Sequence, residues 1–272
     1  MSGETLPSSL SRIDGCERKG PRRVCLGTAL SLKTMSEHHP SALRNRGPIV
    51  EQLKKFFSEF KILPTEAKPT LLALEAASGT GAHLEVFASA FPKIEWIPSE
   101  YVVSDELAAG DIGRIGTRDG DVLSVLDTFG SKKFENVKPA VALDLSKPFH
   151  EWPGLIISNA GNFDAVFASN VTHITPVACT HGLIEASGTI LRDGGLLCIY
   201  GPFKVGGSFT GDGGNERFDQ SLKERNPAWG YRDVEFIESV AVRHGLVLRK
   251  CIDMPANNFM LCLRKEKAKA AN

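Results

Sequence analysis

The sequence predicts an α/β protein with three layers, in which helices cover both faces of a mostly parallel sheet. Short apolar runs alternate with segments of helical spacing, a pattern typical of parallel strands joined by crossover helices. One run, 71–76, leads into a glycine turn and a helical pattern. The last two runs, 246–253 and 258–264, are separated by only four residues. Because that gap is too short for a crossover helix, we expect these two strands to pair antiparallel.

Composition and charge describe an ordinary globular domain. The 272 residues are 42% hydrophobic and 24% charged, with a formal net charge of +0. This balance gives no electrostatic argument for a nucleic-acid or membrane partner. The six cysteines form no C-x-x-C pair, so no metal site is expected. Cys198 and Cys262 lie in apolar runs and are expected to be reduced buried thiols, which suits a cytoplasmic protein.

The glycine turn after the first strand is the main candidate for a binding site. Gly79 and Gly81 would begin a dinucleotide fingerprint, but Leu84 occupies its third glycine position, which weakens an NAD-dependent oxidoreductase hypothesis. No Gly-Lys-Ser/Thr follows, so a P-loop is excluded. Glu75 at the end of the strand suits a ligand with a cationic group, such as the amino group of S-adenosylmethionine. A turn that binds no ligand remains an alternative.

Later strands also end in polar side chains. Glu100 ends the strand 94–100, at the position where βαβ units bind ribose hydroxyls, although a surface carboxylate is equally compatible. Asp144 lies in the strand 140–145 and could accept from an adenine amino group or cap the next turn. Asn170 ends the strand 163–170, and the strand 195–200 ends at Tyr200. Open α/β sheets bind ligands beyond this edge.

Helices and tails complete the predicted organisation. Residues 1–40 are expected to be a disordered tail, with an organelle transit peptide or an internal start at Met35 as alternatives. A domain at 41–265 follows, then a disordered tail at 266–272. Pro48 fits the first turn of a helix over 48–60. Further helices are expected at 121–128, 179–191, 215–225 and 233–244, with 192–195 as a helix stop.

Several motifs together resemble the methyltransferase-like 26 family, also called UPF0585 or DUF938. The resemblance runs from about Ser41 to Lys265. Its motifs are Arg44-Asn45, Glu75 to His83, Trp96 to Glu100, Leu143-Asp144-Leu145, His173 to Pro176, Tyr200 to Phe203, Asn226 to Asp233 and Asp253 to Asn258. The chain departs from the family in having Glu100 where Asp is commoner, and in a longer segment over 101–135.

This resemblance implies a Rossmann-like, seven-stranded class I methyltransferase fold that binds S-adenosylmethionine. It implies that the turn 78–81 wraps the methionine and ribose, Glu100 binds the ribose hydroxyls, and Asp144 with Leu145 contacts adenine. Asn170 would lie by the methionine end. The full set of implied cofactor residues is Arg44, Asn45, Glu75, Ala77, Ser78, Gly79, Gly81, His83, Glu100, Asp144, Leu145 and Asn170.

The methyl acceptor is expected over the fourth and fifth strands and is either a small molecule or a protein. His173 is the candidate general base, because the ordinary pKa of histidine lies near neutrality. A histidine that only shapes its loop is the alternative. Tyr200, Asn257 and Asn258 are candidate polar contacts to the acceptor. A rival hypothesis is a non-catalytic module that binds S-adenosylmethionine or another protein on the same fold.

Overall fold

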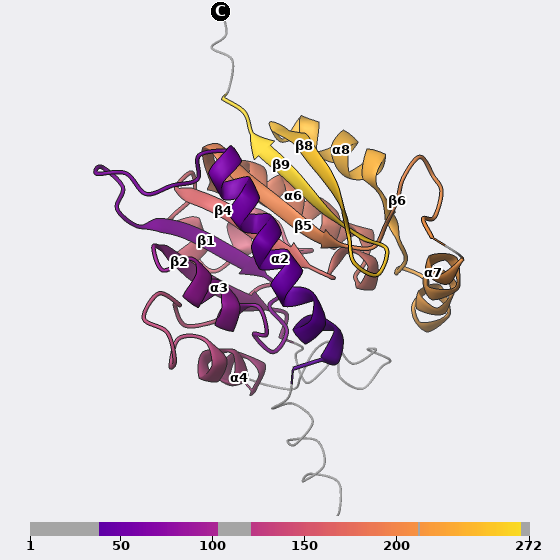
Figure 1. Cartoon of the computed structure of the whole chain (residues 1–272), viewed down its shortest axis with the longest axis horizontal. Helices are drawn as coiled ribbons and strands as arrows, with labels where there is room; N and C mark the ends of the chain where they lie inside the picture. The colour runs from indigo at the N-terminus through magenta and orange to yellow at the C-terminus, as the bar shows by residue number, and fades with distance from the viewer. Residues whose placement is uncertain (1–37, 103–120, 212, 268–272) are drawn as a thin grey trace, which may run out of the picture. The chain divides into compact units, whose positions relative to one another are not determined.

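A computed structural model describes residues 38–102, 121–211 and 213–267. Its main feature is a seven-stranded sheet in the order β3-β2-β1-β4-β5-β9-β8 (Figure 1). The strands are β1 (Leu71–Ala76), β2 (Ile94–Glu100), β3 (Val141–Ala142), β4 (Phe163–Ser169), β5 (Leu191–Gly201), β8 (Leu246–Met254) and β9 (Asn258–Lys265). This arrangement confirms the predicted α/β fold with a mostly parallel sheet.

The direction of the strands changes only at the C-terminal hairpin. Strands β1 to β5 pair in parallel, whereas β9 pairs antiparallel with both β5 and β8. Ala256 and Asn257, between β8 and β9, both have positive φ, at 61° and 54°. Two consecutive residues with positive φ are typical of the tight turns that match the twist of a hairpin. The predicted antiparallel pairing is therefore confirmed.

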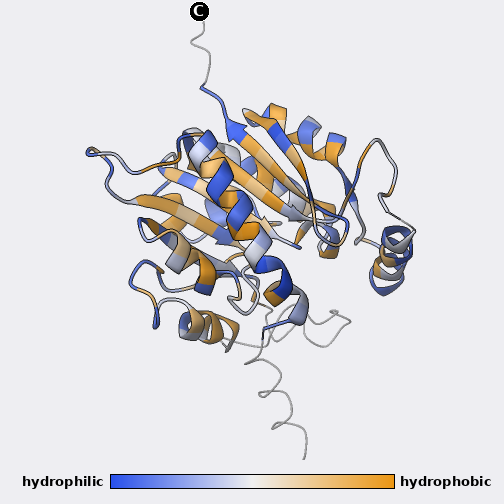
Figure 2. Cartoon of the chain, in the orientation of Figure 1, coloured by the Kyte–Doolittle hydropathy of each residue, from blue (hydrophilic) through white to orange (hydrophobic). Residues whose placement is uncertain are grey.

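Helices cover both faces of the sheet. Helices α2 (Pro40–Glu59), α3 (Leu84–Ala90) and α4 (Asp121–Phe129) pack in one core with alternate strand residues such as Trp96 and Phe167. Helices α5 (Gly154–Ile157), α6 (Val177–Ile190) and α8 (Val234–Arg243) form the core on the other face. Figure 2 shows hydrophobic colouring along most of the central strands, as burial on both faces requires.

A smaller unit lies beyond β5. Strands β6 (Phe203–Lys204) and β7 (Arg232–Asp233) pair in parallel, and α7 (Gly214–Arg225) lies between them in sequence. Leu222, Trp229 and Tyr231 form a small separate hydrophobic cluster there. Two short 3-10 helices, η1 (Phe149–Glu151) and η2 (Thr172–Ile174), precede α5 and α6. Helix α7 confirms the helix predicted over 215–225, whereas β6, β7, η1 and η2 were not predicted from the sequence.

Three predicted boundaries were wrong. The strand expected over 140–145 is limited to β3 (Val141–Ala142), so Asp144 lies in the turn that follows it. Helix α2 begins at Pro40, with His39 as its cap, and passes through Pro48 instead of beginning there. Gly47 helps this continuation, since a residue without Cβ reduces the clash with a following proline. Strand β5 begins at Leu191, immediately after α6, so residues 192–195 form an irregularity within the strand. Gly194 allows this irregularity with a φ of 78°.

Other sequence predictions can be checked directly. Cys198 and Cys262 are free buried thiols, opposite each other on β5 and β9, as expected. Within the described ranges, no helix has the length and apolar character needed to cross a membrane. The tail predicted over 1–40 lies outside the described residues except for its last three, and residues 103–120 of the unusual 101–135 segment also lie outside them.

We predict that Pro48→Ala stabilises the protein by about 1–3 kcal/mol, because proline in a helix interior removes a hydrogen bond and clashes with the preceding turn. Chemical denaturation measures the change in free energy of unfolding. Pro40→Ala is the matched control, because Pro40 occupies the first helical turn, where the missing N–H is harmless. Equal effects of the two substitutions would contradict this explanation.

Candidate functional site

The candidate site lies where the strand order of the parallel part reverses, between β1 and β4. Ligands of open α/β sheets bind at this point, beyond the carboxyl ends of the strands. The turn after β1 has three left-handed residues: Ala77, Gly79 and Gly81, with φ of 56°, 61° and 83°. Glycines in such a turn allow a ligand to approach the backbone closely.

The two turn glycines have different roles. A Cβ on Gly79 would have no described atom within 4 Å, so this glycine faces open space. A Cβ on Gly81 would lie 3.3 Å from Leu126 Cδ2 and 3.4 Å from Phe129 Cβ, both on α4. Gly81 is therefore required for the packing of α4 against the turn, and Gly79 is the glycine that a ligand could approach.

Ser78 and Ser99 join the turn to the end of β2. The backbone N–H of Ser78 donates to the carbonyl of Ser99 at 2.8 Å, and the N–H of Ser99 donates to Ser78 Oγ at 3.2 Å. Both hydroxyls then donate to the carbonyl of Glu75, at 3.1 Å and 2.9 Å. This set of bonds fixes the turn relative to two strands. Ser99 was missed from the sequence, although it lies within the Trp96–Glu100 motif.

Glu100 closes the turn from the adjacent strand. Its carboxylate accepts from the N–H of Gly79 at 2.6 Å and from the N–H of Tyr101 at 2.9 Å. The residue is only 3% exposed. Burial raises the pKa of Glu100 to about 7, although the two N–H donors oppose this rise, and the charge of Glu75 adds to it.

Glu75 is the second buried carboxylate of the site and is 1% exposed. Its Oε1 lies 3.2 Å from Nδ1 of His83. Neither carboxylate oxygen has a well-aligned hydrogen bond from the described part of the chain. His83 is held beneath the turn by Phe87 and Phe167, each with a ring centroid 5.7 Å away. Buried polar groups are normally satisfied, so Glu75 is a candidate to meet a cationic or hydrogen-donating ligand group.

Asn170 and His173 meet at the carboxyl ends of β4 and β5. A Cβ on Gly201 would lie 3.7 Å from both Asn170 Oδ1 and His173 Nδ1. Asn170 has a φ of 57°, and its N–H donates to the carbonyl of Tyr200 at 2.8 Å. Burial lowers the pKa of His173 to about 4, with further contributions from Arg232 and Arg225. His173 is therefore neutral at neutral pH and a weak base.

Of the two predicted residues in the hairpin, Asn258 lies next to Tyr200 and Asn257 does not. The Tyr200 hydroxyl accepts from Asn258 Nδ2 at 3.1 Å, which brings those two predicted residues together. Burial raises the pKa of Tyr200, and the charge of Arg44 opposes this effect. Asn257 is exposed and lies against the loop before α7, where its carbonyl accepts from Asn215 at 3.3 Å. The structure thus does not bring Asn257 to Tyr200.

The remaining predicted residues lie around this centre. Arg44 is exposed and Asn45 is buried, both on α2. Asp144 accepts from the N–H and hydroxyl of Ser146 at 2.8 Å and 2.7 Å, the turn-capping arrangement that was its alternative interpretation. Leu145 is buried, and its carbonyl faces Gly182 of α6. Asp144 remains near Tyr101, whose pKa its charge helps to raise after burial.

Two polar residues outside the predicted set hold loops of the site. Nδ1 of His38 lies 2.9 Å from the hydroxyl of Thr80, so the segment before α2 contacts the glycine turn. Arg232 donates to the carbonyls of Thr175 and Gly230 at 2.7 Å and 2.8 Å, and thereby fixes the loop that carries His173. Arg232 lay in the Asn226–Asp233 motif, whereas nothing in the sequence pattern marked His38.

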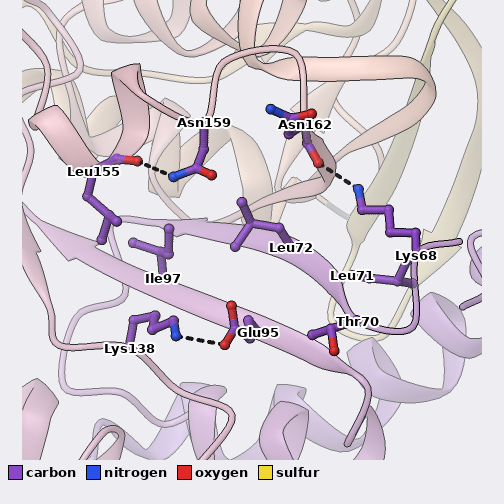
Figure 3. A pocket seen from close by; sticks show the side chains of 10 residues that line it. All are labelled: Lys68, Thr70, Leu71, Leu72, Glu95, Ile97, Lys138, Leu155, Asn159 and Asn162. Carbon is purple, nitrogen blue, oxygen red and sulfur yellow. Dashed lines mark hydrogen bonds and ion pairs between the residues drawn. The ribbon is translucent and has the colours of Figure 1, made fainter.

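A cavity of about 300 Å³ lies elsewhere, at the amino-terminal ends of β1 and β2. Figure 3 shows Leu72 and Ile97 on its floor, with Lys68 and Lys138 at its sides. Lys68 is paired with Asp164 at 2.7 Å, and Lys138 is paired with Glu95 at 2.7 Å. Because its charged groups already have partners, this cavity is a weaker candidate site than the glycine turn.

We predict that Glu100 makes stability depend on pH. Its folded pKa is raised, so the folded state holds the proton more tightly than the unfolded state. Stability is therefore highest near or below the ordinary value of 4.5 and falls as pH rises to about 7. The loss is on the order of 3 kcal/mol. Denaturation of wild type and Glu100→Gln between these pH values measures it, and parallel stability curves would contradict the prediction.

Comparison with known proteins agrees with the overall fold. The family model described as "Protein of unknown function (DUF938)" matches residues 36–265. Among solved structures, the mitomycin 7-O-methyltransferase MmcR has a TM-score of 0.58 at 11% identity. The alignment covers 83% of this chain and 54% of the MmcR chain. A structure described as a putative sarcosine dimethylglycine methyltransferase from Galdieria sulphuraria has a TM-score of 0.58 at 10% identity. The alignment covers 80% of this chain and 86% of that chain.

A third solved structure is an O-methyltransferase family 2 protein from Planctomyces limnophilus in complex with apigenin. Its TM-score is 0.54 at 16% identity, with coverage of 82% of this chain and 64% of that one. The chain spans about half of the length of MmcR, 54%. At these identities the likeness concerns the fold. The extent of the family match shows that the chain belongs to the DUF938 family, and its fold is that of class I methyltransferases.

Proposed function

We propose that the protein is an S-adenosylmethionine-dependent methyltransferase that acts on a small molecule or a protein. One observation carries the proposal. Two buried carboxylates, Glu75 and Glu100, end adjacent parallel strands on either side of a glycine turn that is open at Gly79. The fold shared with methyltransferases supports it further.

The residues of the turn fit the chemical groups of this cofactor. The carboxylate of Glu75 lacks a well-aligned donor within the described ranges and suits the cationic amino group of the methionine part. Glu100 would accept from the ribose hydroxyls, and Gly79 would allow the backbone close to them. Asn170 would contact the methionine end. Ala77, Ser78 and Gly81 would shape the turn, and His83 would hold Glu75 in place from below.

The outer residues would complete the cofactor site. Arg44 is exposed and cationic, so it suits the cofactor carboxylate, with Asn45 beside it on α2. Asp144 and Leu145 would form the adenine side. For Asp144 this role requires the carboxylate to serve both Ser146 and the ligand, which its second oxygen permits, because only Oδ1 accepts from Ser146.

When bound, S-adenosylmethionine supplies an electrophilic methyl group, so the protein needs mainly to orient the acceptor and exclude water. His173 and Tyr200 are the groups that would meet the acceptor. A pKa of about 4 makes His173 too weak a base to remove a proton from a weakly acidic group, but leaves it a suitable hydrogen-bond acceptor. This arrangement favours orientation over strong base catalysis.

Isothermal titration calorimetry with S-adenosylmethionine and S-adenosylhomocysteine tests the cofactor part of this proposal. Heat of binding at micromolar to millimolar concentrations would support it, and no binding of either ligand would refute it. Transfer of a labelled methyl group to any component of a cell extract would then separate an enzyme from the non-catalytic alternative. Cofactor binding without any transfer would favour a binding or interaction module.

We predict that Gly79→Val weakens S-adenosylhomocysteine binding by at least about tenfold, or ~1.4 kcal/mol. Valine would place methyl groups in the space that the ligand approaches and would strain a left-handed residue. Calorimetry measures the affinity, and thermal denaturation measures the accompanying loss of stability.

Gly161→Val is the matched control. Gly161 also has a positive φ, 78°, and no described atom within 4 Å of its Cβ position. It precedes β4 and therefore lies at the amino-terminal ends of the parallel strands, opposite to the glycine turn. It should lose comparable stability and keep its affinity for S-adenosylhomocysteine. If both variants bind equally well, the turn does not hold the cofactor.

A further inference from the structure

A group of aromatic rings lies next to the proposed cofactor site. His173 has ring centroids 6.0 Å from Phe218 and 6.1 Å from Tyr231, and Phe209 lies 5.6 Å from Tyr231. We call these four residues the aromatic face. Phe218 is 42% exposed, unusual for a large aromatic side chain with aromatic neighbours on one side. The exposed part of Phe218 offers apolar surface on which one more ring could pack.

The polar atoms of the aromatic face are suited to a hydroxyl group. Nδ1 of His173 is buried and has no hydrogen-bond partner among the described residues. This atom and Asn170 Oδ1 each lie 3.7 Å from the Cβ position of residue 201. Tyr231 stays protonated, because burial raises its pKa to about 12, with the charge of Asp219 adding to the rise. One group can therefore accept a hydrogen bond, and the other can donate one.

The charge around this face is mainly positive. Arg232 and Arg225 both act electrostatically on His173, and Arg44 acts on Tyr200. Arg232 donates only to backbone carbonyls, so no carboxylate in the described part of the chain neutralises it by direct pairing. Asp219 is the nearby carboxylate, and its charge acts on both Arg232 and Tyr231. It accepts from the N–H of Tyr231 at 2.6 Å and pairs with Lys223 at 2.5 Å, so this further cation offsets its charge.

These three features select among possible acceptors. A protonated amine would be repelled by the arginines, and it would first have to lose its proton near a histidine that is a weak base. A phenol can donate to His173 as the neutral molecule. As the phenolate it is stabilised by the positive field and can accept from Tyr231. Its ring can pack on Phe218, which an aliphatic alcohol could do only in part.

We propose that the aromatic face binds a flat aromatic acceptor through an acidic hydroxyl group, and that it selects phenols over amines. Only the role of the bound molecule as methyl acceptor rests on the proposed function. The preference for phenols over amines can be measured without methyl transfer. The residues that carry it are His173, Phe218 and Tyr231, with Arg232 and Arg225 as the source of the field.

The experiment uses 4-nitrophenol, whose absorbance distinguishes the phenol from the phenolate, and 4-nitrobenzylamine, which has the same ring with a cationic group. Binding to the full-length protein is measured with and without S-adenosylhomocysteine. We expect 4-nitrophenol to bind at least about tenfold more tightly than the amine, a difference of ~1.4 kcal/mol. We also expect the bound phenol to be more ionised than the free phenol at the same pH.

Two substitutions locate the binding. Phe218→Ala should weaken 4-nitrophenol binding at least about fivefold, whereas Val242→Ala should leave it unchanged. Val242 is a fair control, because it is also an exposed apolar side chain, 59% exposed, on α8. Both variants are at exposed positions and should fold, which thermal denaturation checks.

Each outcome has a defined meaning. Equal binding of the amine, an unshifted ionisation, no binding of 4-nitrophenol at millimolar concentration, or an unaffected Phe218→Ala variant would overturn the proposed preference. If the protein binds the phenol as expected but not S-adenosylhomocysteine, the proposed function fails while the aromatic-face proposal stands. If it binds S-adenosylhomocysteine but not the phenol, the reverse holds.

Discussion

The arrangement of the site depends on the hydrogen bonds between Ser78, Ser99 and the carbonyl of Glu75. These bonds tie a turn with three left-handed residues to the ends of two parallel strands. Left-handed conformations are costly for residues other than glycine, and they persist where surrounding contacts hold them. Together with the 2.6 Å bond from the N–H of Gly79 to the carboxylate of Glu100, this link fixes the position of Gly79 relative to Glu100.

The link also keeps two acidic groups close together in a buried place. Glu75 and Glu100 belong to neighbouring strands, and the charge of Glu75 contributes to the raised pKa of Glu100. Buried like charges oppose folding, so such a pair is commonly found where a ligand compensates for it. Around the aromatic face, where we propose that the acceptor binds, the charge is reversed, because Arg232 and Arg225 act on a neutral His173. The two halves of the site thus differ in the sign of their electrostatic field.

Much of the fold could be predicted from local patterns, and the failures have physical reasons. The run ending at Ala76 gave a correct strand because residues 71–74 are continuously apolar, and the shorter, interrupted run ending at Glu100 also forms a strand. Pro48 led to a wrong helix start, since the packing of Ile49, Leu53 and Phe56 in the core on one face of the sheet helps to keep α2 continuous through this proline. Residues 192–195 resemble a helix stop but form an irregular strand, because β4 pairs with β5 on both sides of them.

Site residues on a single strand or turn could be predicted, whereas contacts between distant segments could not. The positions of Glu75 and Glu100 at the carboxyl ends of their strands could be predicted from the order of the strands along the sequence. The contact of His38 with Thr80 joins residues 42 positions apart and has no local signal. Asn257 and Asn258 are neighbours in sequence, yet a hairpin turn sends only Asn258 to Tyr200.

We propose that Glu75, Glu100 and the turn between them hold a methyl donor. A crystal structure of the protein with S-adenosylhomocysteine would test this proposal. We expect the ribose hydroxyls within hydrogen-bond distance of the Glu100 carboxylate, the amino group on the side of Glu75, and the ligand next to Gly79. A ligand bound away from this turn, for example in the cavity at the amino-terminal ends of β1 and β2, would contradict it.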